Sequence, residues 1–406
     1  MEMTPNEKKK LLILAAVGLL FSVAFALVLN GSPAVRYRSD IYLRWYASEK
    51  LLAEGRNLYD PRSAEEVTTL VHGEARQTNY FYPAPMLLFT GPLALLPFRT
   101  AHLVWTLAGQ LFYLAGLWIV ARAVGWPRSV GGFTIFMSIS VLFIPYFQHT
   151  IWSQFNTIGL LSLALCYVAL RRGRYLLAGA LATGLTFKPH TTVLALGFLL
   201  LWALFERRRW RFYLGFLVTG AVLWALAELA QPGWVLDFVG SLGGYRASAS
   251  VLDTVWNPYQ IPAAVLCLAV VAVVVASRRA SPASPAFAGC LALSLVAWFL
   301  VVPAIGMMHA VLLPVAALLL LPALQERRPA LYRPALYGLA LVYLLGIAAF
   351  AWGLSSPERY GLHTRWSQMA YEAAAPILIG LFSIPLVLPP RAPQPVEVAA
   401  PAGEEA

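Results

Sequence analysis

The sequence predicts a polytopic α-helical membrane protein, and two observations carry this prediction. Hydrophobic residues make up 59% of the 406-residue chain and charged residues only 12%, against roughly 45–50% and about 25% in a typical soluble domain. In addition, apolar runs of about 20 residues, the length that crosses a bilayer as a helix, recur along the chain. The three cysteines lie inside such runs, which indicates small buried side chains and no disulfide framework.

About twelve apolar segments are expected to cross the membrane as helices. In chain order they cover residues 11–30, 100–121, 130–147, 153–170, 174–188, 189–205, 209–230, 259–277, 284–302, 304–322, 332–353 and 371–389. A further apolar segment, 84–97, is shorter, contains Gly91-Pro92 and is bounded by Pro83 and Pro97. We therefore expect it to be re-entrant or interfacial.

Arginine and lysine clusters define the expected orientation. They lie at alternate ends of the predicted spans, for example at 171–174 and 207–209, and positive residues mark cytoplasmic loops. The basic clusters alternate between the two ends of successive spans, with both termini inside, if residues 84–97 do not span the membrane. The net charge of +11 then gathers on the cytoplasmic face, where it indicates topology and attraction to anionic membrane lipids. It makes no case for nucleic acid as a partner.

The chain is expected to form one membrane domain, residues 1–389. Its outer segment 31–83 carries aromatic and leucine residues at helical spacing, which predicts short juxtamembrane helices lying on the membrane surface after the first span. The remaining residues, 390–406, are rich in proline, alanine and glutamate, so we expect a disordered cytoplasmic tail.

Asp40 is the first candidate for chemistry. It lies ten residues beyond the first predicted span, close to Arg36, Arg38 and Arg44. These arginines favour the ionised carboxylate, which suits a general base. The alternative is a helix cap for residues 41–53, a common role of aspartate.

Polar residues at predicted membrane depth supply further candidates. Tyr82, at the end of the outer segment, either lines a substrate site or belongs to an ordinary aromatic belt. Gln154 and Asn156 open a predicted span within one helical turn. Two amides there need partners, which are either a hydroxylated ligand or a neighbouring helix.

Two basic side chains complete this set. Lys188, in Phe187-Lys188-Pro189-His190, lies near the predicted outer face and either meets an anion such as a polyprenyl phosphate or snorkels to water. His309 lies one turn into a predicted span and is either functional or a hydrogen-bonded packing residue. Metal-ligand spacings, a P-loop and GxGxxG are missing from the sequence, so we expect neither a metal nor a nucleotide cofactor.

Taken in order, these motifs resemble glycosyltransferase family 87 over residues 10–350. The motifs that carry the resemblance are Asp40-x-x-x-x-Trp45-Tyr46, Tyr82-Pro83, Gln154-x-Asn156, Thr186-Phe187-Lys188-Pro189, Asn257-Pro258-Tyr259-Gln260 and Pro303…His309. Each motif is short, and their order and placement supply the specificity. Two departures concern the donor sugar and the acceptor: Pro258 replaces the family's frequent Gln-Ser, and Met307-Met308 replace an aromatic residue or histidine.

The resemblance implies a GT-C fold and a transferase at the outer face of the plasma membrane. Its expected donor is a polyprenyl-phosphate sugar, most simply mannose, and its acceptor a glycolipid or glycan. Asp40 would be the catalytic base, and His309 would lie close to the donor phosphate. Further candidate phosphate contacts are Lys188, Arg38 and Arg365. Candidate substrate-lining residues are Tyr46, Tyr82, Gln154, Asn156, His190 and Asn257.

A lipid or glycolipid transporter, or flippase, is the competing class, because twelve spans are also common among transporters. It predicts charged pairs deep in the helices and an internal repeat. The charged residues here gather at the ends of the apolar segments, which favours an enzyme acting at one face.

Overall fold

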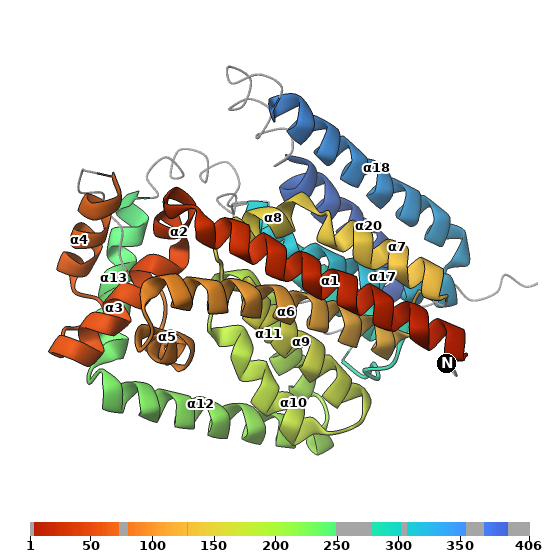
Figure 1. Cartoon of the computed structure of the whole chain (residues 1–406). Coiled ribbons are helices and arrows are strands. Elements are labelled where there is room, and N and C mark those ends of the chain that lie inside the picture. Colours follow the sequence, from red (N-terminus) through yellow and green to blue (C-terminus); the bar gives the residue numbers. More distant parts are fainter. Residues whose placement is uncertain are drawn as a thin grey trace, which may run out of the picture.

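The computed structural model describes residues 4–72, 80–127, 129–248, 278–301, 307–354 and 369–388, and every element in these ranges is helical (Figure 1). The elements in chain order are α1 (Pro5–Gly31), α2 (Pro33–Arg38), α3 (Asp40–Glu54), α4 (Pro61–His72), η1 (Ala84–Met86), α5 (Leu87–Ala94), α6 (Phe98–Val124), α7 (Val130–Val141), α8 (Ile144–Ile151), α9 (Asn156–Arg171), α10 (Tyr175–Ala182), η2 (Thr183–Thr186), α11 (Pro189–Leu204), η3 (Arg207–Arg209), α12 (Trp210–Ala230), α13 (Trp234–Ser248), α16 (Pro285–Val301), η5 (Met307–Leu312), α17 (Leu313–Arg327), α18 (Pro329–Leu354), η6 (Met369–Ala374) and α20 (Ala375–Val387). The predicted tail 390–406 lies outside the described residues.

Within these ranges, six helices are long and apolar enough to cross a membrane. They cover Leu12–Gly31, Phe98–Val124, Arg207–Ala230, Met307–Arg327, Pro329–Gly353 and Ala370–Val387. A seventh span results if α7 and α8, which are bent by 49° relative to each other, are counted as one. The chain is therefore a multi-pass helical membrane protein by length and composition.

The predicted number of about twelve spans is not reached by this criterion. Several predicted spans form shorter apolar helices, Asn156–Arg171 and Thr191–Leu204 among them. At 1.5 Å per residue such helices are about 20–24 Å long, less than the roughly 30 Å of hydrocarbon. The segment 84–97, which was predicted not to cross the membrane, also forms a short apolar helix, Ala84–Ala94. The predicted span 259–277 lies outside the described residues.

The outer segment after α1 folds into the short helices α2, α3 and α4 (Figure 1). Helix α3 is bound to α5 and to the turn that follows it. The Trp45 indole donates to the carbonyls of Leu93 and Leu96 at 3.0 and 3.1 Å, and the Ser48 hydroxyl donates to Thr90 at 2.8 Å. The segment therefore has a fixed position on one end of the bundle.

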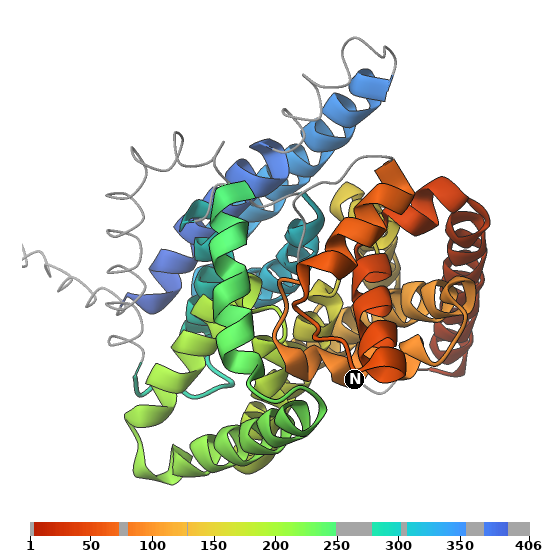
Figure 2. The same cartoon turned by 90° about the vertical axis from the view of Figure 1, so that its left-hand side faces the viewer.

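Helix α13 covers the same end, alongside the helices of the outer segment (Figure 2). Asn57 Nδ2 donates to Asp237 Oδ2 at 2.6 Å, and the Leu58 amide donates to Gln231 Oε1 at 3.2 Å. These bonds join residues about 180 positions apart. They hold the loop between α3 and α4 in place.

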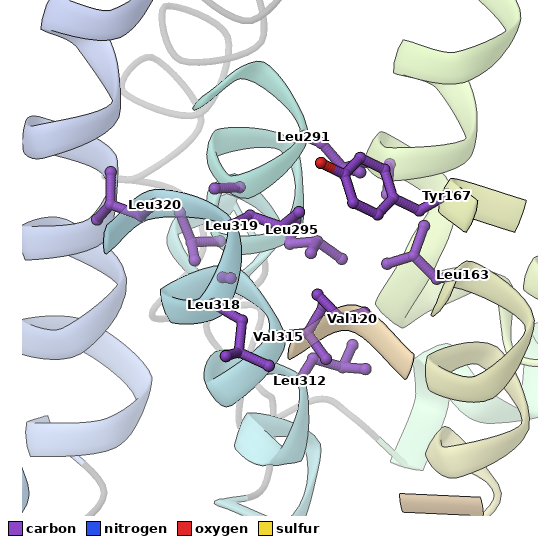
Figure 3. Packing of buried hydrophobic residues seen from close by; sticks show 14 of the residues in the cluster. Val120, Leu163, Tyr167, Leu291, Leu295, Leu312, Val315, Leu318, Leu319 and Leu320 are labelled. Atoms are coloured by element: carbon purple, nitrogen blue, oxygen red, sulfur yellow. The ribbon is translucent and has the colours of Figure 1, made fainter. Parts of the chain in front are cut away.

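The main hydrophobic core lies where α6, α9, α16 and α17 meet (Figure 3). Leu291 and Leu295 of α16 pack between Tyr167 of α9 and the leucines of α17. By contrast, α1, α12 and α18 leave most of their apolar surface exposed. These outer helices present their leucines and valines to lipid.

Two glycines allow α10 and α12 to approach closely. A Cβ on Gly179 of α10 would overlap the carbonyl of Phe212, and a Cβ on Gly215 of α12 would overlap the carbonyl of Leu176. Small residues at facing positions bring helix backbones together in this way. The contact orients the α10–α11 region, whose connecting turn carries Lys188.

Candidate active site

Asp40 is bound at both its backbone and its side chain by the turn between α8 and α9. Its amide donates to the carbonyl of Trp152 at 2.9 Å, and its carboxylate Oδ2 accepts a hydrogen bond from Gln154 Nε2. Ser39 is the N-cap of α3, and Asp40 is the first residue inside the helix. The carboxylate is therefore directed to another element, instead of capping its own helix.

The Gln154 amide joins Asp40 to Lys188. Gln154 is 2% exposed, and its Oε1 accepts a hydrogen bond from Lys188 Nζ while its Nε2 donates to Asp40. Lys188, between η2 and α11, is 5% exposed. Its ammonium group therefore does not snorkel to water. One amide thus connects a carboxylate near the N-terminus with an ammonium group from the middle of the chain.

Tyr82 and Arg44 enclose the same place. Lys188 Nζ lies 5.8 Å from the centroid of the Tyr82 ring, and the Arg44 guanidinium lies 4.9 Å from it. Arg44 also donates to the backbone carbonyl of Asp40 at 2.9 Å. The Tyr82 ring packs against Phe155 at 5.1 Å. Cations over aromatic faces are stabilised, so both contacts favour this position of the ring.

Basic side chains outnumber carboxylates at this place. Asp40 and Arg44 are the charged groups that act on Lys188, so one carboxylate faces two basic side chains. Burying an uncompensated charge costs free energy unless a counter-ion is supplied. The arrangement is therefore suited to a ligand that carries one negative charge.

Asn156 connects this place to His309. Its side-chain amide contacts His309 Nδ1 at 3.0 Å and donates to the Met308 carbonyl at 3.3 Å. Both side chains are buried, and η5, which carries His309, packs against α8 and α9. Gln154 and Asn156, two residues apart, thus contact Lys188 and His309 respectively.

The turn that presents Gln154 is held in an unfavourable backbone conformation. Ser153 has a φ of 47° although it is not glycine, a conformation that persists only where the surroundings enforce it. Helix α6 provides those surroundings. Trp105 donates to the Ser153 carbonyl at 3.1 Å, and His102 Nε2 lies 3.3 Å from the Ser153 hydroxyl. His102 Nδ1 is in turn 3.2 Å from Asn30 of α1.

Two predicted site residues lie apart from this arrangement. The Tyr46 hydroxyl donates to Glu66 at 2.7 Å, and Arg56 donates to the same carboxylate at 2.7 Å. Burial, together with Glu66, raises the pKa of Tyr46 to about 12. Arg38 is exposed at the end of α2. Neither contacts Asp40 or Lys188 through a described hydrogen bond.

The remaining predicted residues cannot be placed as side chains. His190 belongs to the first turn of α11, next to Lys188. Arg365 and Asn257 lie outside the described residues. Conversely, the sequence reasoning missed His102 and His149. A signal for His102 was present, because His102, Thr106 and Gln110 repeat every four residues on one face of an apolar helix.

The fold and this site define a multi-pass membrane protein with a buried polar cluster that holds one carboxylate and two basic side chains. The chain matches the model of glycosyltransferase family 87 over residues 80–303, slightly more than half of its length, and therefore belongs to that family. No curated protein and no solved structure matches the chain.

Family membership confirms the resemblance seen in the motifs and makes the protein a membrane glycosyltransferase, so a transporter is not favoured. The matched range contains Tyr82, Gln154, Asn156 and Lys188. Asp40 and His309 lie outside it, and the contacts described above are what connect them to it.

Proposed function

We propose that the protein transfers a sugar, most simply mannose, from a polyprenyl-phosphate carrier to a glycolipid or glycan at the outer face of the plasma membrane. The observation that supports this proposal is the buried Lys188, joined to Asp40 by one amide and accompanied by Arg44. A sugar phosphodiester carries one negative charge, which would balance the two cations and one carboxylate.

In this proposal Asp40 is the general base. Its carboxylate takes the proton of the acceptor hydroxyl as the hydroxyl oxygen bonds to the anomeric carbon. The bond from that carbon to the phosphate oxygen breaks, and its electron pair leaves with the polyprenyl phosphate. Attack opposite to the leaving group inverts the anomeric configuration, through an oxocarbenium-like state.

Cationic side chains would stabilise the departing phosphate. Lys188 is placed to do so, because its only described hydrogen-bond acceptor is a neutral amide oxygen. His309 approaches from η5 and is oriented by Asn156. The proposed reaction uses no metal ion, since these side chains meet the developing charge.

The deciding experiment measures sugar transfer from radiolabelled polyprenyl-phosphate-mannose in membranes that contain the protein. Asp40→Asn keeps the shape of the side chain but removes the base, so we expect transfer to fall by about 10²–10⁴-fold. Asp60→Asn is the matched control, because Asp60 lies in the same outer segment and binds Arg62 at the surface. Equal transfer by the unchanged protein and Asp40→Asn would refute the role of Asp40.

A further inference from the structure

His149, on α8, is a buried side chain that the reaction above does not use. It is 3% exposed, and its Nε2 has no hydrogen-bond partner among the described residues. Buried ring nitrogens are normally hydrogen-bonded, and leaving one open costs stability. A ligand atom is one partner that would satisfy such a nitrogen.

The position of His149 indicates which ligand that would be. Its backbone carbonyl accepts a hydrogen bond from the backbone N–H of Gln154 at 3.1 Å, and its side chain lies within electrostatic range of Lys188. Helix α8 also packs against η5, which carries His309. His149 therefore approaches the neighbourhood of Lys188 from the α8 side.

We infer that His149 Nε2 donates a hydrogen bond to a phosphate oxygen of the lipid-linked donor. A neutral imidazole carries one N–H, and we assign it to Nε2, the nitrogen without a partner among the described residues. A phosphate group offers several acceptor oxygens, and a charged acceptor strengthens the bond. The inference rests on the proposed function, because that function supplies the phosphate.

The test compares two amide substitutions of His149. In His149→Gln the side-chain nitrogen reaches roughly the position of Nε2, whereas in His149→Asn it reaches only that of Nδ1. Binding of polyprenyl phosphate to the purified protein is measured, which requires no turnover. Polyprenol, which lacks the phosphate, is the ligand control.

We expect His149→Asn to weaken polyprenyl phosphate binding by about tenfold or more, the effect of losing one hydrogen bond to a charged group. His149→Gln should retain most of the affinity, and polyprenol binding should be the same for all three proteins. If the asparagine variant does not fold, His149→Met gives the same contrast, because methionine fills the space without a donor.

Equal binding of polyprenyl phosphate by the unchanged protein and His149→Asn would overturn the inference about His149 and leave the proposed function standing. Weakened binding of both polyprenyl phosphate and polyprenol would also overturn it, since the effect would not depend on phosphate. If the unchanged protein itself fails to bind polyprenyl phosphate, the donor in the proposed function is wrong, and the inference falls with it.

Discussion

Replacing Lys188 with methionine should lower activity without a matching loss of stability. The side chain is 5% exposed, and an isolated buried ammonium group costs several kcal/mol after relaxation. With Lys188 present, two cations face one carboxylate. In Lys188→Met, Asp40 and Arg44 remain as a balanced pair, and Gln154 still donates to the carboxylate.

The free energy of unfolding of Lys188→Met should therefore change little, because relief of the excess buried charge offsets the loss of the donor to Gln154 Oε1, which costs about 1–3 kcal/mol. Sugar transfer should fall by about 10–100-fold, because a charge-assisted contact with the donor phosphate contributes about 1.5–3 kcal/mol. The assay pairs thermal unfolding in detergent with the KM and kcat for polyprenyl-phosphate-mannose. A loss of stability together with the loss of transfer would refute this reasoning, since Lys188 would then be structural.

Arg209 supplies a matched control, because it is also buried but has its own partners. It is 3% exposed, pairs with Glu206 at 2.6 Å and lies 3.8 Å from the centroid of the Trp202 ring. Arg209→Met should lower the unfolding temperature and leave the KM for the donor unchanged. The two methionine variants thus distinguish a basic side chain that stabilises the fold from one that binds the donor phosphate.

Two further predictions concern the scaffold. His102→Leu removes a hydrogen bond that holds the Ser153 turn, so kcat should fall about tenfold. His102→Gln, whose side-chain nitrogen reaches roughly the position of Nε2, should restore part of the lost kcat. Equal kcat values for the unchanged protein and His102→Leu would contradict the role of His102 in positioning. Gly215→Ala would push a methyl group into the Leu176 carbonyl, so thermal unfolding should report a loss of about 1–3 kcal/mol. Gly220→Ala, where the added methyl meets no neighbour, should not show that loss.

Candidate residues were easiest to predict where the residue type alone is costly in a membrane. Asp40 and Lys188 stand out in an apolar sequence because each charge needs a partner. Their connection through Gln154 could not be predicted, since it depends on how α3, the α8–α9 turn and α11 pack. His149 was missed because a single histidine in an apolar helix also fits ordinary packing.

Helix geometry explains why Tyr46 and Arg44 of α3 reach different partners. Tyr46 is six residues beyond Asp40 in α3, so at about 100° per residue it points roughly 120° away and reaches Glu66 instead. Arg44, four residues beyond Asp40, shares its face and approaches the site. The four-residue spacing from Asp40 on its own favours Arg44 over Tyr46 as a residue of the site.

The excess of one cation at the site has a consequence for how a catalytic cycle would end. In the proposed reaction the donor is a monoanion, whereas the released polyprenyl phosphate is a monoester with close to two negative charges at neutral pH. The proton taken up by Asp40 leaves Lys188 and Arg44 without a carboxylate counter-charge. The site is thus balanced with donor before the transfer and with product after it. Product departure and the loss of that proton are therefore coupled, and release of the phosphate is the step expected to limit turnover.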